Sequence, residues 1–398
     1  ITNMNGTQTV YYAQDGTKRV NGSSSSYGAS YSNGDIIGIA LDLDASPQTV
    51  TFYKNNSSQG SLNLTDVGNE GYSVSCGSGS GSTNATANFG QDSTFSGSTT
   101  AGGNTDDNGI GDFAYAPPSG YLALCTANLP EPTIIDGSEN FTPYIYTADN
   151  TSPKSRTGIG FTPDFLWFKD RTTAFSNGLY DTVRGPNKQL QTNNTSAENT
   201  YTLLDSFDAD GFTTTLDGTA GNVLNYSTDN YVTWSWKAGG TPTATNSAGA
   251  GNVPTSGSVM INGVASTSSL AGTIAADKIS ANTTAGFSII SYTGNGLSGQ
   301  TVAHGLSSAP EFIVHKDRGT NSNNGQWNAW HKYAGDGDDY GYLSVTNAFT
   351  GDAQIIPNGT DTIELKANLT TTNQSNHNFI MYAWHSVEGY NKVGSYIG

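Results

Sequence analysis

The chain has 398 residues, and its 16 lysines and arginines stand against 33 aspartates and glutamates, which gives a formal net charge of −17. This acidic balance disfavours a nucleic-acid partner, and no apolar run approaches the roughly 20 residues of a membrane-spanning helix. Only 12% of the residues are charged, whereas 11% are aromatic, too many for a disordered polar tract, so the composition indicates a β-rich protein of extracellular type.

Residues 1–125 show the alternating apolar pattern of strands joined by turns. Residues 36–44 begin apolar and then alternate with polar positions, as in a strand with one buried face. Pro47 ends this strand, and residues 49–54 form the next one. The pattern predicts a β-hairpin of a sandwich, followed by Gly/Ser-rich loops over 77–109.

The same hairpin resembles the core of the SPRY domain, a concanavalin-like β-sandwich. Residues 34–44 (GDIIGIALDLD) and 50–55 (VTFYKN) are similar to its central hairpin, and 87–90 (ANFG) to its closing strand. The resemblance implies a SPRY-like β-sandwich over 1–133. Because the usual first half of such a domain is short here and the chain starts at Ile1, we expect the sequence to begin part-way into that domain.

The junction at 113–134 (FAYAPPSGYLALCTANLPEPTI) resembles one that follows SPRY-like domains in structural proteins of marine tailed phages. In those proteins it leads into tandem β-rich domains of unknown function. The resemblance implies a virion fibre or other appendage protein, assembled in the host cytoplasm, whose partners are other virion proteins. Such appendages are usually homo-oligomers, often trimers, and the resemblance implies an oligomer here as well, whose neighbours cover the sheet edges.

A tandem repeat can be shown from the residues alone. Residues 161–171 (FTPDFLWFKDR) match 308–318 (SAPEFIVHKDR), and 231–239 (YVTWSWKAG) match 379–389 (FIMYAWHSVEG). In the two copies the proline and the last tryptophan of these segments are 73 and 74 positions apart. This shared register predicts a duplication of a unit of about 100 residues.

We therefore predict an all-β chain in which a SPRY-like sandwich is followed by two tandem β-sandwich-like repeats, at 134–240 and 287–391. The segment 241–286 is rich in Gly, Ala, Ser and Thr and is interpreted as a linker, either flexible or packed as a small β element. The tail at 392–398 resembles residues 290–294 and is interpreted as the start of a further repeat.

The sequence predicts a protein that is not an enzyme and needs no cofactor. All five histidines lie in the second repeat, and there is no HExxH, GxSxG or P-loop motif. Paired acids such as Asp42 and Asp44, or Asp205, Asp208 and Asp210, could mark a glycoside hydrolase. We interpret Asp42 and Asp44 instead as residues that cap the end of a strand.

Two charged motifs have both a structural and a functional interpretation. Lys-Asp-Arg follows an apolar strand in each repeat, at 169–171 and 316–318. We expect a charge cluster that pairs across the sheet or a subunit boundary, with a ligand-binding arginine as the alternative. The acidic turn with Asp336, Asp338 and Asp339 is a calcium candidate, because Ca²⁺ favours oxygen ligands, but it lacks the spacing of an EF-hand. We expect solvated turn residues and no bound metal.

The two cysteines, Cys76 and Cys125, occur in no CxxC motif and no Cys/His cluster, which excludes a structural zinc site. We expect two small buried side chains, with a single disulfide as the alternative.

Aromatic residues flanked by amides and carboxylates suit a sugar-binding surface, because pyranose CH faces stack on rings while the hydroxyls find polar partners. Trp234 and Trp236 lie two positions apart on a predicted strand and are expected to pack in the core. The best candidate cluster for a glycan lies in the second repeat and comprises Trp327, Trp330, Asn323, Asn324 and Asp336.

Two classes of function follow. The first is a structural protein of a phage virion, such as a tail fibre, that binds a host-surface glycan without catalysis and gains strength from many copies. The alternative is a secreted bacterial adhesin or a carbohydrate-active enzyme. The junction and the tandem repeats favour the first class.

Overall fold

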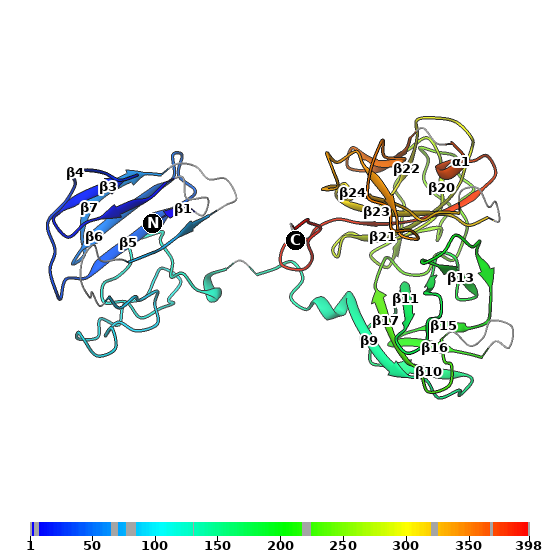
Figure 1. Ribbon diagram of the computed structural model, residues 1–398, viewed down its shortest axis with the longest axis horizontal. Helices are drawn as coiled ribbons and strands as arrows, with labels where there is room; N and C mark the ends of the chain where they lie inside the picture. Colours follow the sequence, from blue (N-terminus) through cyan, green and yellow to red (C-terminus); the bar gives the residue numbers. More distant parts are fainter. Residues whose placement is uncertain are drawn as a thin grey trace. The chain divides into compact units, whose positions relative to one another are not determined.

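The computed structural model of the protein (Figure 1) describes residues 2–3, 8–64, 71–76, 85–129, 131–216, 224–319, 325–366 and 369–396. It divides into two compact units, Ile1–Pro130 and Glu131–Gly398. The protein is 2% helical and 38% strand, which confirms the all-β prediction. No helix among the described residues is long and apolar enough to cross a membrane.

The first unit contains two three-stranded sheets and a short two-stranded one. Its strands are β1 (Thr2–Asn3), β2 (Val10–Tyr12), β3 (Thr17–Val20), β4 (Ser23–Ser26), β5 (Ile37–Asp42), β6 (Thr49–Lys54), β7 (Ser57–Asn63) and β8 (Tyr72–Ser73). The sheet orders are β2-β3-β4, β5-β6-β7 and β1-β8. The predicted hairpin is confirmed as β5 and β6, which pair antiparallel and contribute Val50 and Phe52 to the core of this unit.

The cysteine prediction is wrong for both residues. Cys76 is exposed and Cys125 is half-buried, and both thiols are free. The reason is their position outside the regular strands. Cys76 follows β8 in an irregular segment, and Cys125 directly precedes the short 3₁₀ helix η1 (Thr126–Asn128), so neither lies on the core face of a sheet.

The second unit begins with the 3₁₀ helix η2 (Gly137–Glu139) and the first repeat. The strands of this repeat are β9 (Phe141–Thr147), β10 (Lys154–Thr157), β11 (Phe165–Asp170), β12 (Gly178–Asp181), β13 (Lys188–Gln191), β14 (Asn199–Thr200), β15 (Leu204–Asp208), β16 (Gly211–Thr214) and β17 (Asn230–Trp236). They form a six-stranded sheet, β14-β13-β12-β11-β17-β9, and a three-stranded sheet, β10-β16-β15.

The second repeat has the same plan with additional strands. It comprises β18 (Val259–Ile261), β19 (Val264–Ala265), β20 (Ala276–Asn282), β21 (Phe287–Thr293), β22 (Gln300–Ala303), β23 (Phe312–Asp317), β24 (Asn328–His331), β25 (Tyr340–Tyr342), β26 (Ile355–Asn358), β27 (Thr362–Leu365), the short helix α1 (Leu369–Thr372) and β28 (Asn378–Trp384). Its sheets have the orders β19-β18-β20-β21-β28-β23-β24-β25 and β22-β27-β26.

The strands that the two repeats share have the same order. The order β13-β12-β11-β17-β9 in the first is the order β25-β24-β23-β28-β21 in the second, and the small sheets correspond in the same way. The register is also shared, since Trp236 pairs with Phe165 and Phe141 just as Trp384 pairs with Phe312 and Phe287. The predicted duplication is therefore confirmed in both topology and register.

Of the two interpretations of residues 241–286, the flexible linker is wrong. Strands β18, β19 and β20 come from this segment, and β20 pairs antiparallel with β21. The packed small β element is confirmed, as part of the large sheet. The physical reason is that Val259, Ile279 and Ala281 are almost fully buried, although small polar residues surround them in the sequence.

Each repeat has its own core, and a third core joins the two repeats. One face of each large sheet packs on its own small sheet, as with Leu166 and Phe168 in the first repeat. The opposite faces meet, and the ring of Phe165 lies 5.6 Å from that of Phe287 and 4.8 Å from that of Tyr382. This third core, which we call the inter-repeat core, also contains Trp327.

We expect Gly239→Val to destabilise the contact between the repeats. A Cβ atom at Gly239 would lie 2.2 Å from the carbonyl oxygen of Met260 and 2.5 Å from the amide nitrogen of Ala281. Because both are backbone atoms of the second repeat, the free energy of unfolding should fall by about 1–3 kcal/mol. Urea unfolding followed by tryptophan fluorescence measures this loss, since all six tryptophans lie in the second unit.

The matched control is Gly249→Val in the same segment. A Cβ atom there would meet only the side-chain amide of Asn252, at 3.4 Å. We expect a change within about 0.5 kcal/mol. Equal losses in the two variants would contradict the role assigned to the close approach at Gly239.

Candidate functional site

The tryptophans of the predicted glycan cluster are not exposed. Trp327 has no accessible surface, and its Nε1 donates a 2.8 Å hydrogen bond to the carbonyl oxygen of Gln191 in the first repeat. Trp330 is 5% exposed and belongs to the core of the second repeat. The prediction that these two rings face a sugar is therefore wrong, because β24 and the residues before it place them in the interior.

The polar members of that cluster have other surroundings. Asn323 and Asn324 lie outside the described residues. Asp336 is exposed and accepts a hydrogen bond from the backbone N–H of Asp338 at 3.0 Å, while the Asp338 carboxylate pairs with Lys366 at 2.9 Å. In the part of the chain that the structure describes, Asp336, Asp338 and Asp339 do not form a group that could hold a metal ion.

The acids considered for catalysis serve turns. Asp42 Oδ1 accepts hydrogen bonds from the backbone N–H groups of Asp44 and Ala45, at 3.0 and 2.9 Å, which confirms the capping interpretation for Asp42. Asp208 accepts from two hydroxyls of its own hairpin, and Asp210 accepts from the backbone of the loop after β10. These carboxylates are thus engaged in local structure.

The Lys-Asp-Arg motif of the second repeat pairs across the boundary between the repeats. Arg318 donates two hydrogen bonds to Glu198 of the first repeat, at 2.8 and 2.9 Å. Lys316 has no accessible surface and donates to the carbonyl oxygen of Thr195 at 3.3 Å, and burial lowers its pKa to about 8. Asp317 accepts from His377 at 2.8 Å.

A buried ion network continues from Glu198 into the inter-repeat core. Glu198 also pairs with Arg184 at 3.2 Å, and Arg184 pairs with Asp181 at 2.6 Å, with both of the latter side chains fully buried. The Tyr382 hydroxyl donates to Asp181 at 2.7 Å from the second repeat. Burial raises the pKa of Glu198, but Arg318 and Arg184 outweigh it, and the net shift is downward. The network fixes how the two repeats sit on each other.

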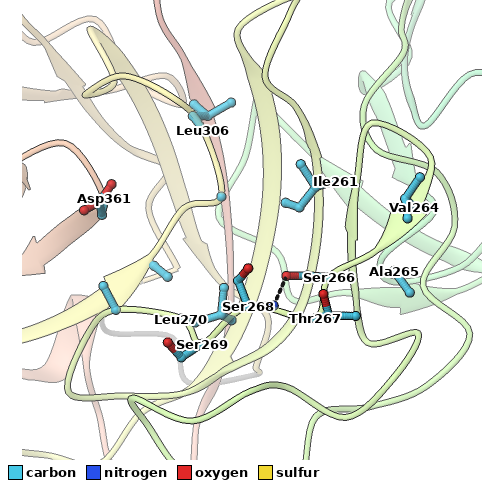
Figure 2. Close-up of a pocket in the computed structure, with 13 residues that line it drawn as sticks. Ile261, Val264, Ala265, Ser266, Thr267, Ser268, Ser269, Leu270, Leu306 and Asp361 are labelled. Carbon is cyan, nitrogen blue, oxygen red and sulfur yellow. Dashed lines mark hydrogen bonds between the residues drawn. The ribbon is translucent and has the colours of Figure 1, made fainter.

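A cleft of about 570 Å³ lies on the second repeat (Figure 2). One wall is the β18–β19 hairpin, with Ile261 and Val264, and the loop 266–271 continues from it. Ala303 at the end of β22, Gly305 and Leu306 after it, and Asp361 between β26 and β27 complete the lining. Figure 2 shows Ser266 to Leu270 between Val264 and Asp361.

The lining combines hydroxyl groups, apolar side chains and one carboxylate. Ser266, Thr267, Ser268 and Ser269 supply four hydroxyls in succession, and Thr267 to Ser269 are exposed. The loop is held to the sheet where the amide of Ser266 donates to the carbonyl of Val259 at 2.8 Å. Hydroxyls beside an apolar floor suit a ligand that has both CH faces and hydroxyl groups.

The cleft carries no positive charge at neutral pH. Asp361 is the one ionisable side chain among its lining residues. His304 lies just behind the lining residues Ala303 and Gly305 and is fully buried, and this burial lowers its pKa to about 4. The imidazole is therefore neutral, and the site disfavours phosphorylated or carboxylated ligands.

Sequence reasoning missed the cleft. The run Ser266–Ser269 was visible, but it falls in the segment interpreted as a linker, where low complexity suggests exposed loop rather than a site. The other lining residues come from positions 303–306 and 361, and only the fold brings these together with the serine run.

Residues 136–263 and 260–398 each match the family described as a domain of unknown function, DUF7483. The two matches cover well over half of the chain. The protein belongs to the DUF7483 family. No curated protein and no solved structure matches the chain.

The second DUF7483 domain extends through residue 398, so it includes the tail at 392–398 that was interpreted as the start of a further repeat. The described part of that tail is attached to the second domain, since the amide of Val393 donates to the Ser386 hydroxyl at 3.0 Å. The cleft lies in this second domain. The SPRY resemblance of residues 1–133 stays a prediction.

Proposed function

We propose that the protein is a non-catalytic structural component of a phage virion appendage, and that it binds a neutral host-surface glycan in the cleft of the second DUF7483 domain. The virion assignment is supported by the resemblance of the junction at 113–134 and by the tandem β repeats. The glycan assignment is supported by the cleft, and its run of four hydroxyl side chains is the observation that carries it.

The chemistry of the cleft favours a neutral saccharide or an amino sugar. Serine and threonine hydroxyls both donate and accept hydrogen bonds, so they match the hydroxyls of a sugar ring. Ile261, Leu270 and Leu306 offer apolar surface to its CH groups, and Asp361 can accept from ring hydroxyls or an ammonium group. A cleft this open holds one ligand weakly, and many copies on one particle would raise the avidity.

A glycan array probed with the multimerised full-length protein tests this proposal. We expect binding to neutral or amino-sugar glycans, and Asp361→Ala should weaken it about tenfold, the loss of one charge-assisted hydrogen bond. Ser268→Phe should abolish binding by filling the cleft.

The matched control is Asp352→Ala, which removes an exposed carboxylate of the same domain outside the cleft. It should bind like the wild type. Glycan binding that survives both cleft substitutions would reject the site, and failure of the multimerised wild type to bind any glycan would leave a purely structural protein.

A further inference from the structure

The two DUF7483 domains bury the same sheet face to very different extents. In the second domain, the face turned toward the first includes Val314, Tyr382, Ile289, Ile380 and Ser291, and each is 4% exposed or less. These residues adjoin one another across β23, β28 and β21. All but Ser291 belong to the inter-repeat core, in which the first domain covers them.

The equivalent positions of the first domain are more exposed. Register places Trp167, Trp234 and Pro143 in one row across β11, β17 and β9, with Val232 and Ile145 in the adjoining row. Ile145 is 64% exposed, Pro143 is exposed, and the other three are half-buried, with Trp167 at the edge that packs against the inter-repeat core. We call these five residues the open face.

The difference arises because the contact between the domains is head to tail. The first domain contributes mainly β11, β12 and β13, through residues such as Phe165, Leu179 and Leu190, whereas the second contributes β21, β28 and β23. The two domains therefore use different but overlapping parts of the same sheet face, since Trp236 of β17 and Trp327 just before β24 also contribute to this core. Such a heterologous contact leaves part of the face unused at each end and can be repeated between copies.

The part of the second domain's sheet face that this contact leaves unused is also apolar. Gly341 of β25 occupies the position that Leu190 of β13 has in the first domain. Gly341 pairs with Ala329 of β24, just as Leu190 pairs with Leu179 of β12. A Cβ at Gly341 would lie 2.8 Å from the ring of Phe349, so this ring takes the place of the leucine. Phe349 is 37% exposed, and Leu343 and Val345 nearby are 37% and 38% exposed.

We propose that the open face binds a second copy of this chain. The surface that it contacts on that copy's second domain is the one formed by Phe349, Leu343 and Val345, which we call the Phe349 side. The contact repeats between copies the head-to-tail arrangement that joins the two domains within one chain. An exposed isoleucine and half-buried tryptophan side chains on one surface meet exposed phenylalanine and leucine side chains on the other, and desolvation of both surfaces drives association. The proposal is independent of the glycan site, which lies elsewhere on the second domain.

Sedimentation velocity of the full-length protein over a range of concentrations tests the contact. We expect the wild type to associate, and Ile145→Lys and Phe349→Asp should each weaken association at least about tenfold, since each places a charge in an apolar contact. Leu297→Lys is the matched control. It changes an apolar side chain that is 59% exposed in a loop outside both surfaces, and it should associate like the wild type.

Mixing the two variants separates a head-to-tail contact from a symmetric one. The Ile145→Lys variant retains an intact Phe349 side, and the Phe349→Asp variant retains an intact open face. An equimolar mixture should therefore form a dimer although neither variant associates alone. Three outcomes would each overturn the proposal. The wild type could be monomeric at all concentrations, association could resist both substitutions, or the mixture could stay monomeric while the wild type associates. Circular dichroism and thermal unfolding confirm that each variant is folded.

Discussion

Replacing Arg184 by methionine should lower the free energy of unfolding of the second unit by about 3–5 kcal/mol. The substitution leaves the Asp181 carboxylate, which is fully buried, without its ion-pair partner at 2.6 Å. It also removes one of the two arginines that face Glu198. A buried charge without a partner is far more costly than a lost surface contact. Urea unfolding followed by tryptophan fluorescence measures the effect, because all six tryptophans belong to this unit.

Lys154→Met provides the matched control for Arg184→Met. Lys154 pairs with Asp149 at 2.7 Å, but the two side chains are 37% and 40% exposed, so the loss should stay below about 1 kcal/mol. The double variant Asp181→Leu with Arg184→Met should recover part of the stability, since it removes both buried charges together. If Arg184→Met costs no more than Lys154→Met, the network does not contribute to the joint between the domains.

Acidification should destabilise the second DUF7483 domain below about pH 6.5. Burial, with a further contribution from Lys316, lowers the pKa of His315 to about 3, and burial lowers that of His304 to about 4. At a pH between the histidine pKa of the unfolded chain, about 6.5, and the lower pKa values of the folded chain, only the unfolded chain binds these protons. The free energy of unfolding should therefore be insensitive to these groups above pH 6.5 and fall by about 1.4 kcal/mol per pH unit and histidine below it.

His315→Phe tests this pH dependence with a residue that the fold already accepts. Phe168 occupies the same position in the first domain and is 1% exposed. Tyr292, which hydrogen-bonds His315, keeps its bond to the carbonyl of Thr372. We expect stability near that of the wild type at pH 7 and an advantage of about 2 kcal/mol at pH 5. If the free energy of unfolding of the wild type and of His315→Phe falls equally with decreasing pH, His315 is not the group that takes up the proton.

The sequence alone was sufficient for the strand content and for the duplication. Period-two alternation identifies a strand with one buried face, because successive side chains point to opposite sides of a sheet. The matched anchors, such as Trp236 and Trp384, established the repeat, and the structure shows them paired in the same register. The capping role of Asp42 was also predictable, because a turn is a local structure.

Tertiary structure decided which surfaces are covered. Asn and Gly surround Trp327 in the sequence and suggest an exposed ring, but Trp327 is buried by a neighbouring domain whose contact has no local signal. The same holds for Asp181 and Arg184, which resemble ordinary surface charges in the sequence and lie instead in the inter-repeat core. The segment 241–286 resembled a linker because small polar residues dominate it, yet strand pairing with β21 depends on backbone hydrogen bonds that composition does not reveal. The cleft formed because this pairing brings the run Ser266–Ser269 next to Asp361, nearly a hundred residues later in the chain.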